Sequence, residues 1–318
     1  MHLTRLLCCC LAISATIGQA DEPGNSRLLV ICGHPGDDEY RTQFADSIDS
    51  IVAALHERGG FAPEHTTILF GADEMQSDGA ALPAGVDGPS TFEQIQAATA
   101  AIKGRLDPDD SLWVVVLGHA YFDGRRTWFN VPGDDPDSDQ LAALFDDLPC
   151  QESVFWVTTS VSGFFLKPLS AEGRVLISAT EADREINATL MPEVLAEVLS
   201  DPPPLSEFDQ DGDGRGTLLD LYLLTARRIA QRYVDENLVA TEHGQLDDNG
   251  DGRPTEVQRP FLSEELGGTL REGEPAQPIE AGRDGSRASQ IDLSAWLPAE
   301  TPQEPATDAA PTDPPPTL

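Results

Sequence analysis

The sequence lacks an apolar run long enough to cross a membrane. A spanning helix needs roughly 20 consecutive apolar residues, and the longest candidate, residues 6–17, is shorter than that. This run follows a positively charged start and precedes the small residues Gly18-Gln19-Ala20, which is the three-part pattern of a secretory signal peptide. We therefore expect a signal peptide over residues 1–20, export to the periplasm or the outside of the cell, and no transmembrane segment in the mature chain.

The sequence is also short of positive charge. It has 20 Lys and Arg against 55 Asp and Glu, a formal net charge of −35, and Lys103 and Lys167 are its only lysines. Such a surface repels nucleic acid and anionic lipid, so we exclude a nucleic-acid partner. It would attract cations or a basic protein or peptide partner, although solubility or adaptation to salt would favour the same composition. Charge alone names no partner.

Cysteine is scarce once the leader is removed. Three of the five cysteines lie in the leader, and only Cys32 and Cys150 remain. Two cysteines form no disulfide framework, and no cluster of His and Cys indicates a zinc site. Both follow or adjoin apolar runs, which is typical of buried small side chains. After export, a disulfide between Cys32 and Cys150 is one possibility.

What the sequence does contain is a regular alternation of apolar runs and amphipathic segments. Nearly continuous apolar runs predict buried strands, at residues 27–33, 65–71, 112–117, 153–158 and 174–179. Segments with apolar residues at spacings of three and four predict helices, at residues 37–58, 90–106, 138–148, 189–199 and 217–238. Residues 121–131 are expected to form a small hairpin. The alternation predicts an α/β fold with a mostly parallel sheet and helices on both faces.

The chain divides by composition into three parts after the leader. We expect an α/β domain over residues 26–199 and an acidic extension with a loop and a helix over residues 205–258. From residue 267 to 318, Pro, Glu, Gly, Ala and Thr dominate without apolar periodicity. Such a segment buries too little apolar surface to offset its ordering entropy, so we expect it to be disordered.

Two polar residues follow buried strands, where α/β proteins place their ligand sites. His119 comes directly after the strand at 112–117, and Ser160 comes just after the strand at 153–158. A histidine can act as a general base near neutral pH, and a hydroxyl beside it can become a nucleophile. Gly118, Ser162 and Gly163 flank the pair and predict tight turns with backbone N–H groups available to an oxyanion.

These two blocks, Gly118-His119 and Ser160-Val161-Ser162-Gly163, resemble the motifs of caspase/legumain-like cysteine peptidases. In that family one strand ends in His-Gly and a later strand ends in Cys-x-Ser-Gly. The Pro-Gly-Asp-Asp-Glu-Tyr segment at residues 35–40 and the Thr-Glu-His block at 241–243 further resemble bacterial caspase-fold proteins of unclear activity. The resemblance implies a caspase-like three-layer sandwich.

The resemblance also implies that His119 is the general base and that Ser160 occupies the position of the nucleophile. Serine there departs from the family, as does Ala120 in place of the glycine after the histidine. A hydroxyl is far less acidic than the thiol that such sites ionise, and no acid that would complete a serine triad is evident. We therefore expect a non-catalytic pseudopeptidase or regulatory protein. Two alternatives stay open: a hydrolase that uses His119 and Ser160, and a peptide-binding interaction module.

Two acidic loops predict calcium sites. The first matches the EF-hand pattern, with the Arg215 carbonyl at position 7, Asp220 at position 12 and acids at positions 1, 3 and 5, namely Asp209, Asp211 and Asp213. The helix at 217–238 would be the exiting helix, and the bound calcium would have a structural role. A second loop repeats only the first half of the pattern and is a weaker metal site, with candidate ligands Asp247, Asn249 and Asp251.

Overall fold

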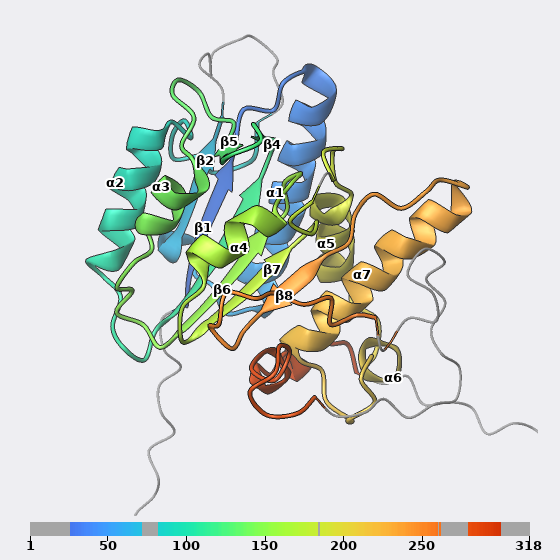
Figure 1. The fold of residues 1–318 in the computed structure, drawn as a ribbon. Helices are drawn as coiled ribbons and strands as arrows, with labels where there is room; N and C mark the ends of the chain where they lie inside the picture. Colours follow the sequence, from blue (N-terminus) through green and yellow to red (C-terminus); the bar gives the residue numbers. More distant parts are fainter. Residues whose placement is uncertain (1–25, 72–81, 184, 260, 262–278, 300–318) are drawn as a thin grey trace, which may run out of the picture.

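A six-stranded sheet forms the centre of the molecule (Figure 1). The computed structural model describes residues 26–71, 82–183, 185–259, 261 and 279–299. The strands lie in the order β2-β1-β3-β6-β7-β8, and all neighbours are parallel except β8, which is antiparallel to β7. Their bounds are Ser26–Cys32 (β1), Thr66–Phe70 (β2), Ser111–Leu117 (β3), Glu152–Val157 (β6), Arg174–Ser178 (β7) and Gln245–Asp247 (β8). The α/β class and the mostly parallel sheet are therefore confirmed.

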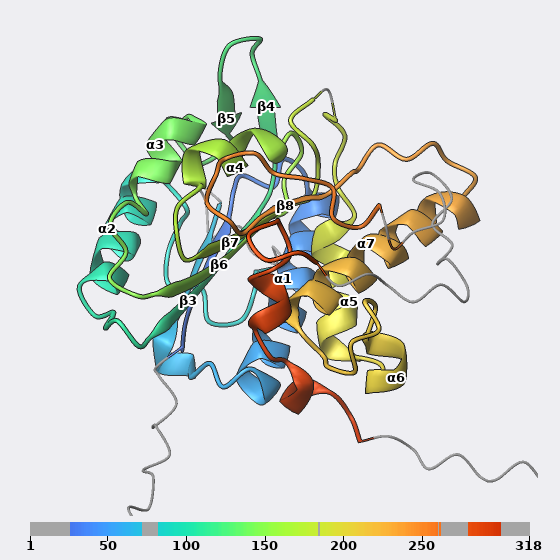
Figure 2. The same cartoon turned by 60° about the horizontal axis from the view of Figure 1, so that its bottom comes forward.

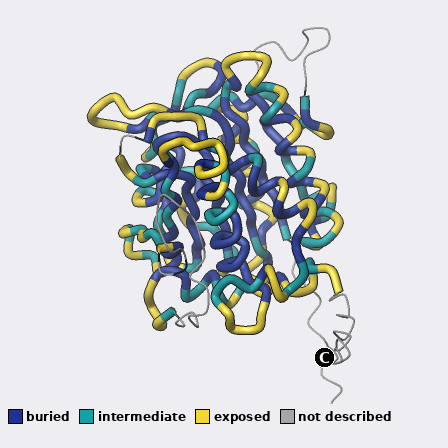
Figure 3. Tube along the Cα trace, turned by 90° about the vertical axis from the view of Figure 1, so that its right-hand side faces the viewer, coloured by how far each residue is buried: buried dark blue, intermediate teal, exposed yellow. Residues whose placement is uncertain are grey.

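Helices cover both faces of this sheet and make three layers (Figures 1 and 2). One face carries α1 (Asp38–Arg58), α5 (Met191–Ser200) and α7 (Leu218–Asp235). The other face carries α2 (Phe92–Lys103), α3 (Ser138–Ala143) and α4 (Gly163–Leu169). Side chains alternate between the two faces along each strand, so each face has its own apolar cluster. Figure 3 shows the buried parts of the chain in the interior of the molecule, with exposed residues on its outer loops.

Several smaller elements complete the described chain. A hairpin of β4 (Ala120–Phe122) and β5 (Thr127–Phe129) stands away from the main sheet (Figure 2), as the sequence predicted. A one-turn helix, α6 (Leu205–Phe208), precedes the first acidic loop. Three short 3-10 helices have the bounds Pro63–His65, Ala288–Gln290 and Ser294–Trp296.

The C-terminal segment corrects the sequence-based expectation of a disordered tail. Residues 279–299 pack against the folded domain, with Ala288 and Leu293 buried and Trp296 lying 5.6 Å from Trp113, ring centre to ring centre. The expectation of disorder is thus wrong for residues 279–299. The rest of the tail, residues 267–278 and 300–318, lies outside the described residues, as does the expected signal peptide.

The two cysteines of the described chain are unpaired. Cys32 is the last residue of β1 and Cys150 precedes the first residue of β6, so they lie at opposite ends of the parallel strands. Both are free thiols. Burial raises the pKa of both thiols, as is usual for inert core cysteines. Among the described helices, none is both long and apolar enough to cross a membrane.

Candidate functional site

The carboxyl ends of β1, β3 and β6 lie side by side along one edge of the sheet. β1 pairs with β3 over its whole length, from Ser26 opposite Ser111 to Cys32 opposite Leu117, and β3 pairs with β6 in the same direction. The chain leaves β1 toward β2 on one side and returns to β3 on the other. Ligands of open α/β sheets bind at such a reversal, outside the strand ends. His119 lies at this position.

Gly118 allows β3 to end close against β1. Its φ of +117° is a conformation that side chains rarely adopt, and a Cβ added there would lie 2.9 Å from the backbone nitrogen of Gly33. This glycine therefore shapes the turn that presents His119.

A backbone carbonyl and two aromatic rings hold the His119 ring. Its Nε2 lies 3.0 Å from the carbonyl oxygen of Pro35, and because that oxygen can only accept, Nε2 carries the proton. The rings of Tyr40 and Phe44, both on α1, lie edge-on to the imidazole at centroid distances of 4.7 and 5.6 Å. No residue in the described chain hydrogen-bonds Nδ1, which is the nitrogen left to accept a proton.

The Ser160 hydroxyl bonds to the chain next to His119 and not to its ring. Its Oγ donates to the carbonyl of Ala120 at 2.9 Å and accepts from the amide of Ala120 at 3.3 Å. The residue is only 3% exposed. The structure thus brings the predicted pair to neighbouring strand ends, but the two side chains have different partners.

The residue after Ser160 has a strained backbone. Val161 has a φ of +47° and is fully buried; this conformation is rare for a β-branched side chain and costs on the order of 1–3 kcal/mol. Its amide donates to the carbonyl of Glu185 at 3.0 Å, and this bond fixes the turn against the chain that follows β7.

Ser162 and Gly163 hold that same chain in place. The Ser162 hydroxyl, which is fully buried, accepts hydrogen bonds from the amides of Ala179 and Thr180, both at 3.0 Å. Gly163 begins α4 and lies so close to the next segment that an added Cβ would be 2.4 Å from the backbone of Glu181 and Ala182. Ser162 and Gly163 therefore both have structural roles here. The tight turn that the sequence predicted at this point is the start of α4.

Sequence reasoning missed two basic residues at the strand ends. His34 follows β1 as His119 follows β3, and its Nδ1 accepts from the amide of Gly36 at 3.0 Å. Arg41 on α1 has Nε and Nη1 buried without hydrogen bonds, and its ion pair with Asp38 is long, at 3.8 Å. A guanidinium with open donors can hold an anionic group. The position of His34 after a strand was a usable signal, whereas the inward direction of Arg41 was not readable from sequence.

A second group of ionisable residues lies where β7 ends and β8 begins. Glu242 is buried and accepts from the amides of Leu190 and Met191, at 2.7 and 2.9 Å, at the start of α5. Burial raises the pKa of Glu242 to about 8, and nearby Glu185 adds to this, while the two amides and His243 oppose it. The His243 ring pairs with Glu185. Glu242 and His243 line a small pocket together with residues of α5 and α7.

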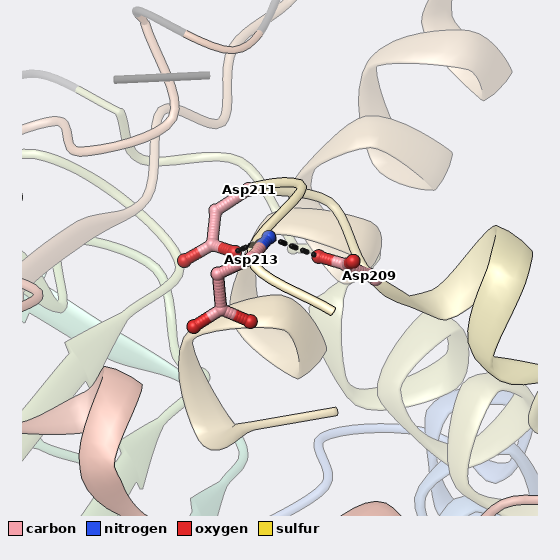
Figure 4. Close-up of side chains that lie close together, drawn as sticks. All are labelled: Asp209, Asp211 and Asp213. Atoms are coloured by element: carbon pink, nitrogen blue, oxygen red, sulfur yellow. Dashed lines mark hydrogen bonds between the residues drawn. The ribbon is translucent and has the colours of Figure 1, made fainter. Parts of the chain in front are cut away.

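The first acidic loop brings three of its predicted ligands together (Figure 4). Carboxylate oxygens of Asp209, Asp211 and Asp213 lie within 4.8 Å of one another. Burial and then the charge of Asp220 raise the pKa of Asp211 to about 7. Asp220 itself is buried, accepts from the amides of Gln210, Asp211 and Thr217, and forms the capping box of α7 with Thr217.

At the first loop, the amide of Arg215 donates to Asp213 at 2.8 Å. Asp220 is not part of the cluster that Asp209, Asp211 and Asp213 form. The metal-binding roles of the Arg215 carbonyl and of Asp220 stay predictions.

The second acidic loop follows β8 and lies at the other end of that strand from Glu242 and His243. Asp247 is 1% exposed and accepts from the amide of Gly250 at 3.1 Å. Asn249 and Asp251 accept from the amides of Asp251 and Arg253, at 2.9 and 2.8 Å. The twelfth position, Gln258, is hydrogen-bonded to Tyr222 and Gly244 and is not a ligand for this loop.

Comparison with known proteins identifies no family for this chain: no protein-family model matches it, and no curated protein matches it.

Proposed function

We propose that the chain is an exported caspase-like protein that regulates or binds a protein or peptide and does not cleave it. The three-layer arrangement, with helices on both faces of one sheet, and the adjacent positions of His119 and Ser160 at strand ends support the caspase-like assignment. The observation that carries the proposal is the partner of Ser160. Its hydroxyl is buried and bonded in both directions to Ala120, so no base withdraws its proton.

The hydrolase alternative has one observation in its favour. The Pro35 carbonyl fixes His119 with Nδ1 as the acceptor, which is a competent form for a general base. Catalysis would require the Ser160 side chain to leave Ala120 and turn toward the imidazole. Among the residues that the structure describes, no carboxylate hydrogen-bonds His119, so this site would lack the third member of a serine triad.

Reaction with a fluorophosphonate probe tests the proposal. We expect the folded wild-type protein to be labelled no more than Ser160→Ala, because a hydroxyl without a base attacks the probe too slowly. Heat-denatured protein sets the background of the measurement. His119→Ala is the matched control for the base. Labelling of Ser160 that disappears in His119→Ala, or turnover of a peptide library that both variants abolish, would establish the hydrolase instead.

An exposed aromatic surface favours a peptide partner over a purely structural role. Tyr121 and Phe122 on the hairpin are 44% and 40% exposed, and the ring of Phe122 stacks on Phe164 of α4 at 4.5 Å. Phe164 lies four residues after Ser160, so this surface is close in sequence to the strand-end site. Aromatic side chains of this kind are enriched where proteins bind peptides and other proteins.

We also propose that the first acidic loop binds a structural calcium ion. The three gathered carboxylates are hard oxygen ligands of the type that calcium prefers. Their mutual repulsion, together with the buried charge of Asp220, would be relieved by a divalent cation. The ion would fix the connection between α6 and α7.

Thermal melting measures this calcium effect. At a calcium concentration about 100 times its Kd, we expect stabilisation of about 2.7 kcal/mol relative to chelator. Asp213→Asn should remove most of that gain, because it deletes one of the clustered charges. Asp235→Asn, which makes the same charge change at the far end of α7, should keep it. An equal response to calcium in Asp213→Asn and wild type would contradict a site in this loop.

A further inference from the structure

The end of α7 and the segment after it expose apolar side chains to solvent. Val234, Leu238 and Val239 lie there and are 40%, 56% and 76% exposed. This end of the helix extends past the edge of the sheet (Figures 1 and 2). Single exposed apolar residues are common on protein surfaces, whereas a group of them is typical of a surface that binds another molecule.

A fourth exposed apolar residue comes from the loop between β7 and α5. Ile186 is 70% exposed, and both of its neighbours bond to the segment that follows α7. The Asn187 amide donates to the Thr241 hydroxyl at 3.1 Å, and Glu185 accepts from the amide of His243 at 3.2 Å. The two segments therefore run side by side. We call their four exposed residues the apolar rim, namely Ile186, Val234, Leu238 and Val239.

A pocket opens beside the apolar rim. Its apolar wall is formed by side chains of α7 and by Ala240, which directly follows Val239. Glu242 and His243 form its polar end. A Lys or Arg side chain has the matching shape and chemistry, because its stem is apolar and only its end is charged.

The charge beside the apolar rim is negative. Residues 233–242 include Asp235, Glu236 and Glu242 and contain no Lys, Arg or His, and the first two of these acids are exposed. At the margins, Arg232 and Arg259 each form ion pairs with glutamates. Positive charge on a partner would complement this surface and negative charge would be repelled.

The net charge of the whole chain narrows the choice of occupant. A second copy would bring a further formal charge of −35, so the two copies would repel each other. The anionic surface of a membrane would be repelled for the same reason. A protein segment with apolar side chains between positive ones complements both the exposed apolar residues and the acids.

We propose that the apolar rim and the pocket beside it form a docking surface for a basic segment of a partner protein, in which apolar side chains lie between lysines or arginines. The apolar side chains of that segment would cover the rim. One of its cationic side chains would lay its stem against α7 and point its charge toward Glu242. This surface is separate from the strand-end site, so its failure would leave the result with the fluorophosphonate probe unchanged.

Fluorescence anisotropy on the full mature chain tests the docking surface. The probe is a labelled peptide of alternating leucine and arginine, which we call the Leu-Arg peptide. In two control peptides, serine replaces every leucine or glutamate replaces every arginine. We expect the Leu-Arg peptide to bind at least about tenfold more tightly than either control, because apolar burial and opposite charge both contribute.

Variants at exposed positions locate the binding. Combining Ile186→Ser with Val239→Ser should weaken binding of the Leu-Arg peptide about fivefold or more, as truncation of interface anchors does. Tyr121→Ser, which removes an exposed side chain from the hairpin, is the matched control and should bind as wild type does. Glu236→Gln should make binding less sensitive to sodium chloride, whereas Glu57→Gln at an exposed position of α1 should not.

The inference is overturned if the Leu-Arg peptide binds no more tightly than its serine counterpart, or if the double variant binds it as wild type does. Loss of binding in Tyr121→Ser alone would assign the docking to the hairpin. That result would overturn the inference and leave the proposed binding of peptides standing. Sedimentation of the free protein is the last check, because a dimer that the double variant lacks would assign the surface to a second copy instead.

Discussion

Replacing Gly163 with alanine is expected to lower the free energy of unfolding by about 3 kcal/mol or more. The new Cβ would lie 2.4 Å from backbone atoms of Glu181 and Ala182, and backbone cannot turn aside as a flexible side chain can. Overpacking of a close-packed interior costs about 1–3 kcal/mol, and more where the neighbours cannot move. Urea unfolding at neutral pH measures the loss.

Gly104→Ala is the control for this substitution. Gly104 ends α2 with a φ of −69°, and an added Cβ would have its nearest neighbour at 3.5 Å, so we expect a change within about 0.5 kcal/mol. Similar losses in the two variants would show that Gly163 is not closely packed against the chain after β7. Ser162-Gly163 would then be open for the oxyanion role that the sequence predicts at this turn.

The parallel strands and most helices could be predicted from sequence because each has a strong local signal. β1 and β3 are almost continuously apolar, and α1 carries apolar residues at helical spacing after the capping residue Asp37. The first turn of α2 was assigned less accurately. The helix was expected from residue 90, but Thr91 caps it, and Ser90 donates its hydroxyl proton to the carbonyl of Cys32.

The elements that sequence reasoning missed depend on contacts between distant segments. β8 has three residues, too few for a periodic pattern, and it exists because it pairs with β7. Residues 279–299 have little apolar character, but their amides are bonded to Asp248 and their Trp296 packs on Trp113. Neither partner is near in sequence, so composition indicated disorder.

The candidate site shows the same division. Positions after strands could be predicted, and His119 and Ser160 lie at the expected edge. Their hydrogen-bond partners could not, because Pro35 and Ala120 are fixed by how β1, β3 and β6 end relative to one another.

Buried Glu242 should make the stability of the fold depend on pH. Its pKa rises from 4.5 to about 8 on folding, mainly through burial, so the protonated carboxyl favours the folded state. The stabilisation is fully present below about pH 4.5 and is lost as the pH rises toward 8. Each unit of difference is worth about 1.4 kcal/mol, so the loss is on the order of 5 kcal/mol.

The effect of Glu242→Gln on the free energy of unfolding is therefore expected to change sign between pH 5 and pH 9. At pH 5 it should be less stable than wild type, because the amide group can accept from only one of the Leu190 and Met191 amides. At pH 9 it should be the more stable protein by a few kcal/mol, because it has no buried charge. Glu185 and His243 are the ionisable groups that also act on Glu242, and both are retained in the variant.

Urea unfolding of wild type and variant at pH 5 and pH 9 measures this effect. Other groups titrate alike in both proteins, so their contribution cancels in the difference between the two free energies of unfolding. Glu197→Gln removes the same charge from a half-exposed position on α5, where Glu197 pairs with Arg232. Its effect should be small and equal at the two pH values, since exposed ion pairs contribute about 0–1 kcal/mol. If Glu242→Gln behaves like Glu197→Gln, Glu242 is ionised throughout, and its two backbone amides, at the start of α5, compensate the cost of burying its charge.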